Sequence, residues 1–158
     1  METSLIGKAL DFGSNEYGFD PRVSNMRYNS YAYVINHLNL AITRKNLYVK
    51  FKHTKKTLEL VQVLHKIGYI NNFSVSVKGY NDSFIHVSPS FFKNTPFFKS
   101  LRLVSTPSKK HYTTLKALYT INKTIKSSVI ILSTSQGLVD HREALRLKIG
   151  GIILCIAS

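Results

Sequence analysis

The chain has 158 residues, and its apolar content of 44% is enough for a hydrophobic core, which excludes a wholly disordered basic tail. Its formal net charge of +14 points to a polyanionic partner, and the single cysteine, Cys155, excludes both an internal disulfide and a cysteine-based metal cluster. No apolar run reaches the length of about 18 residues that a membrane-spanning helix needs.

The charge is unevenly distributed along the chain. Residues 1–20 hold four acids and one base, a sum of −3, so the remainder carries +17. A folded body with this excess of lysine and arginine favours nucleic acid as its partner. An anionic membrane surface is the alternative, but the sequence has no long helix with a basic face opposite an aromatic-rich face.

The first half of the chain predicts an α/β arrangement. Residues 1–27 lack periodicity and are predicted to form an extension. Apolar residues at helical spacing predict a helix over 29–45, which Asn29 or Ser30 can cap, and alternation predicts a strand over 47–52. Thr54 is then predicted to cap a second helix, which Gly68 ends.

Two strands complete this half. Residues 69–78 and 84–89 have strand patterns and are predicted to pair as a hairpin through a turn at 79–82. The expected order is therefore helix–strand–helix–strand–strand.

The second half is predicted to be mostly β-structure. Residues 90–96 read as a connection between two lobes, and 109–113 as a basic strand or loop, whereas 115–120 has no clear type. Strands are expected at 100–105, 129–134 and 151–157, with a short helix at 140–148.

One polar turn near the carboxyl end carries a functional signal. A buried strand ends in Ser133, Thr134 and Ser135, and Gly137 permits a sharp turn. Hydroxyl groups held on a rigid strand end suit the shallow minor groove of RNA, where 2′-hydroxyls and base edges are accessible. An ordinary polar turn is the alternative reading, because serine, threonine and glycine are common in turns.

The following helix has its own start signal. Asp140 and Glu143 have the spacing of a capping box, and Val139 with Ala144 can form the hydrophobic staple.

The order of motifs in this region resembles that of a known family. Residues 133–155 contain, in order, Ser-Thr-Ser-Gln-Gly, Arg-Glu-Ala, Gly-Gly and Leu-Cys. Weaker matches lie at 63–70 (Val-Leu-His-Lys-Ile-Gly-Tyr-Ile), at 103–107 and at Tyr112. Over residues 28–158 the chain resembles the small ribosomal subunit protein 8 family, of bacterial and organellar type.

The resemblance implies a two-lobed α/β (α+β) protein that binds the central domain of small-subunit ribosomal RNA and contacts neighbouring small-subunit proteins. It implies no catalytic activity, cofactor, metal, membrane contact or small-molecule substrate. The expected division is an extension at 1–27, an N-terminal lobe at 28–95 and a C-terminal RNA-binding lobe at 96–158. A free-standing RNA-binding regulator of translation is the alternative function.

The resemblance also implies which residues contact RNA, and it does so for both lobes. In the N-terminal lobe these are the lysines Lys50, Lys52, Lys55 and Lys56. In the C-terminal lobe they are Ser105, Pro107, Lys109, Lys110, Tyr112, Ser133, Thr134, Ser135, Gln136, Gly137, Arg142, Lys148, Gly150 and Gly151.

Several positions depart from the family pattern. Thr106 and Ser108 stand where arginine and glycine are usual, and Gln136 stands where lysine is common. Ile152 replaces the glutamate that usually follows the glycine pair, and Leu40 replaces a glycine. These departures bear on individual RNA contacts more than on the fold.

Other kinds of site have weaker support. The six histidines show no paired ligand spacing, so a metal site is not expected. Ser133 or Ser135 with Asp140 and His141 lacks the spacing of a nucleophile elbow, so a hydrolase is not expected. Four phenylalanines flank two lysines, and stacking on bases is one interpretation, but packing in the core or between the lobes is favoured. They are Phe91, Phe92, Phe97 and Phe98.

The expected compartment is the mitochondrion, with a plastid or a bacterial cytoplasm as alternatives. The sequence favours lysine, asparagine, isoleucine, tyrosine and phenylalanine, which fits the A/T-rich coding of many organellar genomes. Residues 1–25 lack the Arg-rich, acid-poor character of a presequence, so organelle-encoded synthesis or an internal targeting signal is expected.

Overall fold

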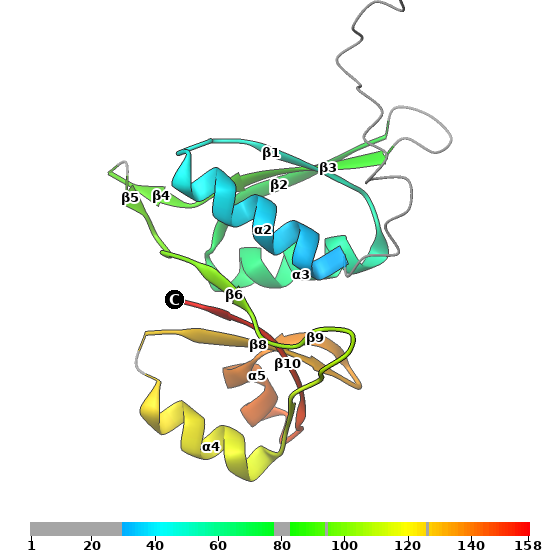
Figure 1. Ribbon diagram of the computed structural model, residues 1–158, viewed down its shortest axis with the longest axis vertical. Coiled ribbons are helices and arrows are strands. Elements are labelled where there is room, and N and C mark those ends of the chain that lie inside the picture. The colour runs from blue at the N-terminus through cyan, green and yellow to red at the C-terminus, as the bar shows by residue number, and fades with distance from the viewer. Residues whose placement is uncertain (1–29, 78–82, 94, 126) are drawn as a thin grey trace, which may run out of the picture.

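The structure is a computed structural model, and it describes residues 30–77, 83–93, 95–125 and 127–158. The predicted extension at 1–27, the candidate cap Asn29 and the predicted turn at 79–82 lie outside the described residues. The fold is a mixed α+β arrangement of two lobes, as the sequence predicts (Figure 1). The exact boundaries of these lobes stay a prediction.

The N-terminal lobe has the predicted order of elements. It consists of α2 (Ser30–Thr43), β1 (Val49–Lys52), α3 (Lys55–Ile67), β2 (Ile70–Val77) and β3 (Ser83–Pro89). The three strands form one antiparallel sheet in the order β1-β3-β2.

Both predicted signals at the ends of α3 are confirmed. The Thr57 N–H donates to the Thr54 hydroxyl at 3.1 Å, which satisfies one of the free amides of the first turn. Gly68 has a φ of 90°, and its N–H donates to the His65 carbonyl. The helix ends there because this left-handed conformation suits glycine best.

The C-terminal lobe is built on a five-stranded sheet and two helices. Its elements are β6 (Leu101–Leu103), β7 (Tyr112–Thr113), α4 (Leu115–Thr124), β8 (Val129–Thr134), β9 (Gly137–Asp140), α5 (His141–Arg146) and β10 (Gly151–Ala157). The sheet order is β6-β10-β8-β9, and β7 also pairs with β10.

Three segments differ from the sequence prediction. The untyped residues 115–120 belong to α4, which the Thr114 hydroxyl caps by accepting from the Ala117 N–H at 3.3 Å. The predicted connection at 90–96 contains a small strand pair, β4 (Phe91–Phe92) and β5 (Thr95–Pro96). Residues 137–140 form β9, which pairs with β8 and was not predicted as a strand.

Strand β8 explains how the two lobes share one interior. All four residues of its run Val129–Ile130–Ile131–Leu132 are buried. Val129 and Ile131 pack with the core of the N-terminal lobe, whereas Ile130 and Leu132 pack with α4 and α5. A continuous apolar run is the pattern expected of a strand that is covered on both faces.

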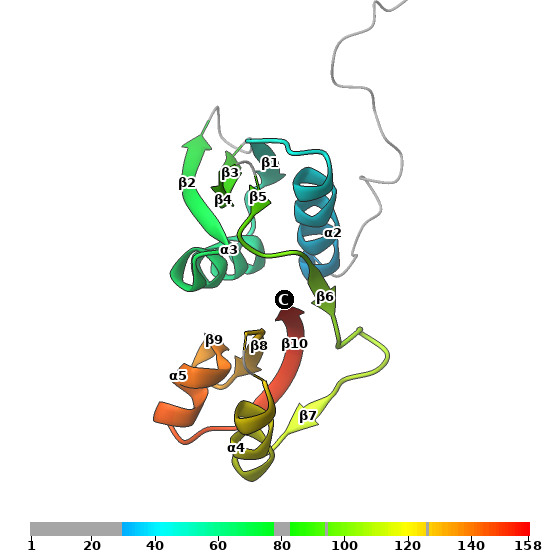
Figure 2. The same ribbon diagram turned by 90° about the vertical axis from the view of Figure 1, so that its left-hand side faces the viewer.

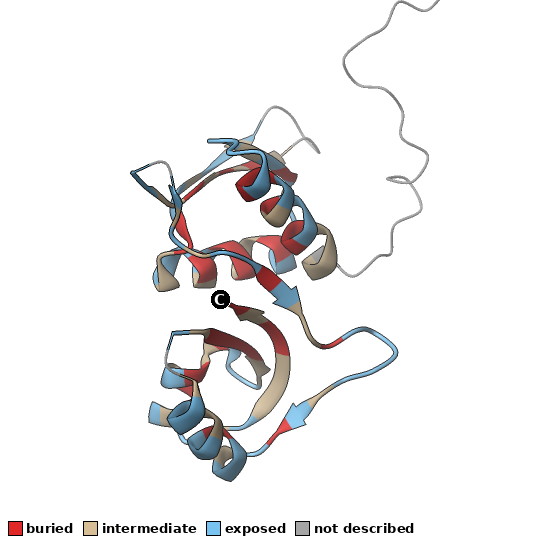
Figure 3. Cartoon of the chain, turned by 60° about the vertical axis from the view of Figure 1, so that its left-hand side comes forward, coloured by how far each residue is buried: buried red, intermediate tan, exposed pale blue. Residues whose placement is uncertain are grey.

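The result is a stack of four layers (Figures 1 and 2). The three-stranded sheet lies at one end, followed by helices α2 and α3, the five-stranded sheet, and helices α4 and α5. The residues that α2 and α3 turn toward the sheets are buried, and the exposed residues gather at the outer surfaces (Figure 3).

An irregularity in β10 prepares the candidate site. Ile153 pairs with Leu132 and Cys155 with Ile131, so Leu154 is an extra residue that forms a β-bulge. The Leu154 carbonyl accepts hydrogen bonds from the N–H groups of Val104, at 2.9 Å, and Ser105, at 3.3 Å. The bulge therefore anchors the segment that leaves β6.

Candidate nucleic-acid interface

A groove of about 340 Å³ lies where the two lobes meet. Its lining residues come from both lobes and are Tyr31, Lys56, Ser105, Thr106, Pro107, Lys110, Ser133, Ile152 and Leu154. Five of these nine were predicted from the sequence to contact RNA, so the fold brings together candidates that lie far apart along the chain.

One wall of the groove comes from the N-terminal lobe. Lys56 lies in the first turn of α3, next to the exposed Lys55. Positive charges at this end oppose the helix dipole, so these lysines do not serve helix stability. Their place favours contact with an anion instead.

Tyr31, near the start of α2, completes this wall. Burial raises the pKa of its hydroxyl, and the carboxylate of Glu59 raises it further. The Tyr31 hydroxyl therefore remains neutral at physiological pH, where it can both donate and accept a hydrogen bond.

The opposite wall is the loop between β6 and β7, which in Figure 2 extends on the same side as the start of α2. Ser105 is only 5% exposed, and its hydroxyl accepts a hydrogen bond from the His111 N–H at 3.0 Å. The N–H of Thr106 donates to the Lys109 carbonyl at 3.0 Å, and the N–H of Lys109 donates to the Thr106 carbonyl at 3.2 Å. These bonds hold the loop in shape and leave Lys109 and Lys110 exposed.

One row of the five-stranded sheet reaches the groove. Ile152 of β10 pairs with Tyr112 on one side and with Ser133 on the other, so the three side chains share one face. Tyr112 is 74% exposed, which leaves its ring free to stack. Ile152, which departs from the family pattern, places an apolar side chain between these two polar ones.

The three hydroxyls of the predicted turn have different surroundings. Thr134 donates to the Gly137 carbonyl at 2.9 Å and accepts from the Gln136 N–H at 3.2 Å, so its hydroxyl closes the hairpin. Ser133 and Ser135 make no side-chain hydrogen bond within the described part of the chain. Their hydroxyls are the ones available to a ligand.

The predicted strand at 129–134 matches β8, and the turn follows it directly. Ser135 and Gln136 form the loop, whereas Gly137 already pairs with Thr134 as the first residue of β9. Gly137 has a φ of 106°, which explains why glycine is needed there.

The glycine pair has a packing reason in this fold. A Cβ atom on Gly150 would lie 2.6 Å from the Thr113 carbonyl oxygen, and one on Gly151 would lie 2.5 Å from the Ser133 carbonyl oxygen. Both neighbours are backbone atoms, so a side chain at either position would push β10 away. Gly151 therefore positions Ser133, and RNA contact by either glycine stays a prediction.

The remaining candidates lie away from the groove. Lys50 and Lys52 lie on the three-stranded sheet. Arg142 lines a second hollow of about 670 Å³, together with Phe97 and Phe98. Lys148 follows the end of α5 with a φ of 55°. The fold thus divides the predicted RNA contacts among separate surfaces.

The predicted packing of the phenylalanines holds only in part. Phe98 stacks on Tyr69 with the ring centroids 5.2 Å apart, but Phe92 and Phe97 are both 65% exposed.

The acids of the C-terminal lobe have structural roles. The Asp140 carboxylate accepts from the Glu143 N–H at 3.0 Å, as predicted for the cap of α5. Glu143 does not complete a capping box, because its two carboxylate oxygens each lie 2.7 Å from Lys66 Nζ in α3. This ion pair joins the two lobes.

His141 is likewise part of the framework. It is 2% exposed, and its Nδ1 accepts a hydrogen bond from the Ile130 N–H at 3.2 Å. Burial lowers its pKa. It therefore stays neutral and anchors β8, which does not suit a general base facing a substrate.

Within the described ranges, no group of three or more His, Cys, Asp or Glu side chains could hold a metal ion. Among the described helices, none combines the length and apolar character needed to cross a membrane.

Sequence reasoning missed four groove residues, Tyr31, Thr106, Ile152 and Leu154. Tyr31 lies in the segment that the sequence predicts as the first helix, and Thr106 and Ile152 stand out in the sequence only as departures from the family pattern. Leu154 reaches the groove because of the bulge, which leaves no signal in an apolar strand.

Comparisons with known proteins agree on one family. The family model described as ribosomal protein S8 matches residues 30–157. The small ribosomal subunit protein uS8 of Buchnera aphidicola subsp. Schizaphis graminum is 34% identical over 110 residues, which are 70% of this chain and 82% of that protein. The small ribosomal subunit protein uS8m of Acanthamoeba castellanii is 27% identical over 118 residues, which are 75% of this chain and 90% of that protein.

Proposed function

Because the chain belongs to the ribosomal protein S8 family, we propose that it is a structural component of the small ribosomal subunit and binds the central domain of the subunit's RNA through the groove between its lobes. Neighbouring small-subunit proteins are its further partners. The single observation that carries this proposal is that Ser105, Ser133, Lys56 and Lys110 line one groove although they come from both lobes. The role includes no catalytic step.

The groove and the residues beside it, Tyr112 and Ser135, each have a task in this proposal. Lys56 and Lys110 neutralise phosphates on either side and fix the orientation of the RNA. The free hydroxyls of Ser133 and Ser135 meet 2′-hydroxyls and base edges in the shallow groove of an RNA helix. Tyr112 offers an exposed ring for an unstacked base. Lysines provide affinity for any RNA, whereas the rigid hydroxyls provide discrimination.

The test compares a structured small-subunit RNA fragment with random RNA in filter binding. The double variant Ser133→Ala/Ser135→Ala is expected to lose about tenfold in affinity for the structured fragment, equivalent to about 1.4 kcal/mol, and to keep its affinity for random RNA. Ser127→Ala, at an exposed serine of the second hollow, is the matched control. Equal losses of affinity for both RNAs would contradict the proposed role of these hydroxyls in recognising the structured fragment.

A free-standing translational regulator is the rival function, and sedimentation separates the two. A ribosomal component travels with small subunits through a gradient at moderate salt. A regulator remains near the top of the gradient, and that result would contradict the proposed function.

We also propose the mitochondrial ribosome as the location. The match to the mitochondrial protein of Acanthamoeba castellanii supports this, as does the preference for residues that A/T-rich codons encode. The bacterial relative from Buchnera aphidicola is more similar in sequence, at 34% identity against 27%. Fractionation of cells that produce a tagged chain tests the proposal. Recovery with plastid or cytoplasmic small subunits contradicts it.

A further inference from the structure

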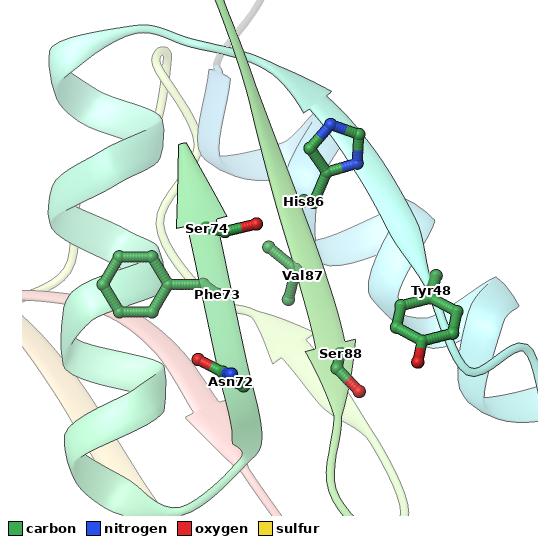
Figure 4. A pocket seen from close by; sticks show the side chains of 7 residues that line it. All are labelled: Tyr48, Asn72, Phe73, Ser74, His86, Val87 and Ser88. Atoms are coloured by element: carbon green, nitrogen blue, oxygen red, sulfur yellow. The ribbon is translucent and has the colours of Figure 1, made fainter. Parts of the chain in front are cut away.

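The outer face of the three-stranded sheet carries a regular array of side chains. The register aligns Lys50 and Lys52 of β1 with His86 and Phe84 of β3, and it aligns Ser88, His86 and Phe84 with Asn72, Ser74 and Ser76 of β2. Tyr48 directly precedes β1 and lies beside Ser88 (Figure 4). We call these nine residues the open face. None of them is buried.

No element among the described residues covers this face. Along β3 the side chains alternate strictly, with Ile85 and Val87 buried in the core and Phe84, His86 and Ser88 partly exposed. Helices α2 and α3 both lie on the buried side of the sheet (Figure 2). Tyr48 is 77% exposed, the largest exposure among the large apolar and aromatic side chains described.

The chemistry of the open face is cationic and aromatic. Lys50 Nζ lies 3.8 Å from the centroid of the Phe84 ring, so its charge is held against the sheet. Ser76 Oγ and His86 Nε2 are 3.0 Å apart and form a hydrogen bond. The array contains no acidic residue, so the charges of Lys50 and Lys52 are not neutralised within it.

A small hollow of about 100 Å³ lies beside Tyr48. Figure 4 shows the Tyr48 ring next to Ser88, with His86 farther along β3, whereas Phe73 points toward α3. Asn72, Ser74 and Ser88 bring an amide and two hydroxyls to its lining. An aromatic ring therefore adjoins groups that can donate and accept hydrogen bonds.

We propose that the open face binds a single-stranded segment of RNA, with one unpaired base stacked on Tyr48. Lys50 and Lys52 contact its phosphates, and the hydroxyls and amide of the hollow contact the edge of the base. This inference rests on the proposed function, because it assumes an RNA partner, but it assigns a second surface with a different kind of RNA ligand.

A protein partner fits this face less well. The core of a protein–protein interface is depleted of charged residues, whereas two lysines without an acid lie on one of the three strands here. Aromatic rings beside a lysine row on an antiparallel sheet instead match the way in which proteins bind single strands, where bases stack and phosphates meet cations.

The chain contains no tryptophan, which permits a local test. Tyr48→Trp places a single tryptophan on the open face, and a ten-nucleotide oligouridylate at low salt is the probe. Stacking of a base is expected to quench the tryptophan fluorescence. Tyr119→Trp, on the exposed side of α4, is the matched control and is expected to show quenching that is severalfold smaller.

Two further measurements separate stacking from charge attraction. An abasic oligonucleotide of the same length should bind without quenching Tyr48→Trp, because it offers phosphates but no rings. Tyr48→Ala should weaken oligouridylate binding roughly tenfold, whereas Tyr48→Phe should retain it, because the ring stays. Equal quenching in the two tryptophan variants, or no quenching in Tyr48→Trp, overturns the inference, and a protein then becomes the better candidate.

The inference and the proposed function can fail separately. If the wild-type chain binds the structured small-subunit fragment but Tyr48→Trp is not quenched, only the inference is lost. If Tyr48→Trp is quenched but the wild-type chain does not prefer the structured fragment or sediment with small subunits, the proposed function is lost and single-strand binding remains.

Discussion

The groove between the lobes and the open face of the three-stranded sheet are both basic surfaces, but the chain builds them differently. The groove combines α2, α3, the loop after β6 and strands β8 and β10, so its residues span positions 31 to 154. The open face uses three neighbouring strands and one repeating pattern of alternation. A concave surface made of distant parts suits a folded RNA, whereas a flat array suits an extended strand.

The largest expected effect comes from a substitution that distorts the groove and leaves the open face unchanged. Gly151→Ala places a Cβ atom 2.5 Å from the Ser133 carbonyl oxygen, so β10 or β8 must move. We expect the free energy of unfolding to fall by about 1–3 kcal/mol, as in overpacked cores. Affinity for the structured RNA should fall with it, while oligouridylate still quenches a tryptophan at position 48. Urea unfolding, filter binding and fluorescence measure the three quantities.

Gly68→Ala is the matched control for this change. Its φ of 90° strains alanine, but no atom lies within 4 Å of the new Cβ, and Gly68 is not among the residues that line the groove. It should lower stability without lowering the affinity of the folded protein for structured RNA. Equal losses of affinity in both variants would mean that stability, and not the position of Ser133, controls binding.

A second, smaller effect separates the two surfaces by charge. Removing Lys56 and Lys110 together should reduce the salt dependence of binding to the structured RNA helix by about one unit of slope per lysine. Removing Lys50 and Lys52 together should leave this slope unchanged and reduce it for oligouridylate. Filter binding over a range of salt concentrations measures both. Slopes that change equally with both RNAs would show that the surfaces are not distinct.

A third effect concerns pH and the strand that carries the hydroxyls. Burial lowers the pKa of His141, so the unfolded chain takes up a proton at a higher pH than the folded chain does. The contribution of the neutral His141 to the free energy of unfolding is complete above the unfolded-state pKa of 6.5. It is lost as the pH falls from that value through the lower pKa of the folded state. Thermal unfolding between neutral and mildly acidic pH measures this. His141→Asn, which keeps an acceptor near Nδ1 but does not titrate, should flatten the profile; an unchanged slope would assign the effect to another group.

The smallest effect concerns the ion pair that joins the lobes. Lys66 and Glu143 are partly exposed, so Lys66→Ala should lower the free energy of unfolding by only about 0.5 kcal/mol. High salt should remove most of the difference, because it screens exposed charges. Lys123→Ala on α4 is the control. A large loss of unfolding free energy that persists at high salt would mean that the Lys66–Glu143 ion pair sets the angle between the lobes and therefore the shape of the groove.

Local signals predicted local structure well. Thr54 and Asp140 cap helices as their spacing indicated, and the β-branched run at 129–132 is a buried strand. The signal failed where packing decides the outcome. The apolar pattern of helix α4 is too weak to predict a helix, and only Leu118 of this helix is buried. Glu143 pairs with Lys66, which lies 77 residues away in the sequence, instead of completing the capping box of its own helix.

The sequence by itself determined the family, the α+β class, the basic character and the identity of most polar residues that line the groove. The class and the basic character follow from periodicity and composition, whereas the family and the groove residues follow from the resemblance carried by the order of the motifs. All of these can be read along the chain without knowing which distant segments are in contact. Only the tertiary structure decided that the Thr134 hydroxyl is hydrogen-bonded within its own hairpin and that Gly151 permits close packing of β10 against β8. It also decided that Tyr31 and Lys56 line the same groove as Ser133. The physical reason is that these relations depend on the register of β10 and on the packing of α2 and α3 between two sheets, and contacts between distant segments leave no periodic trace in the chain.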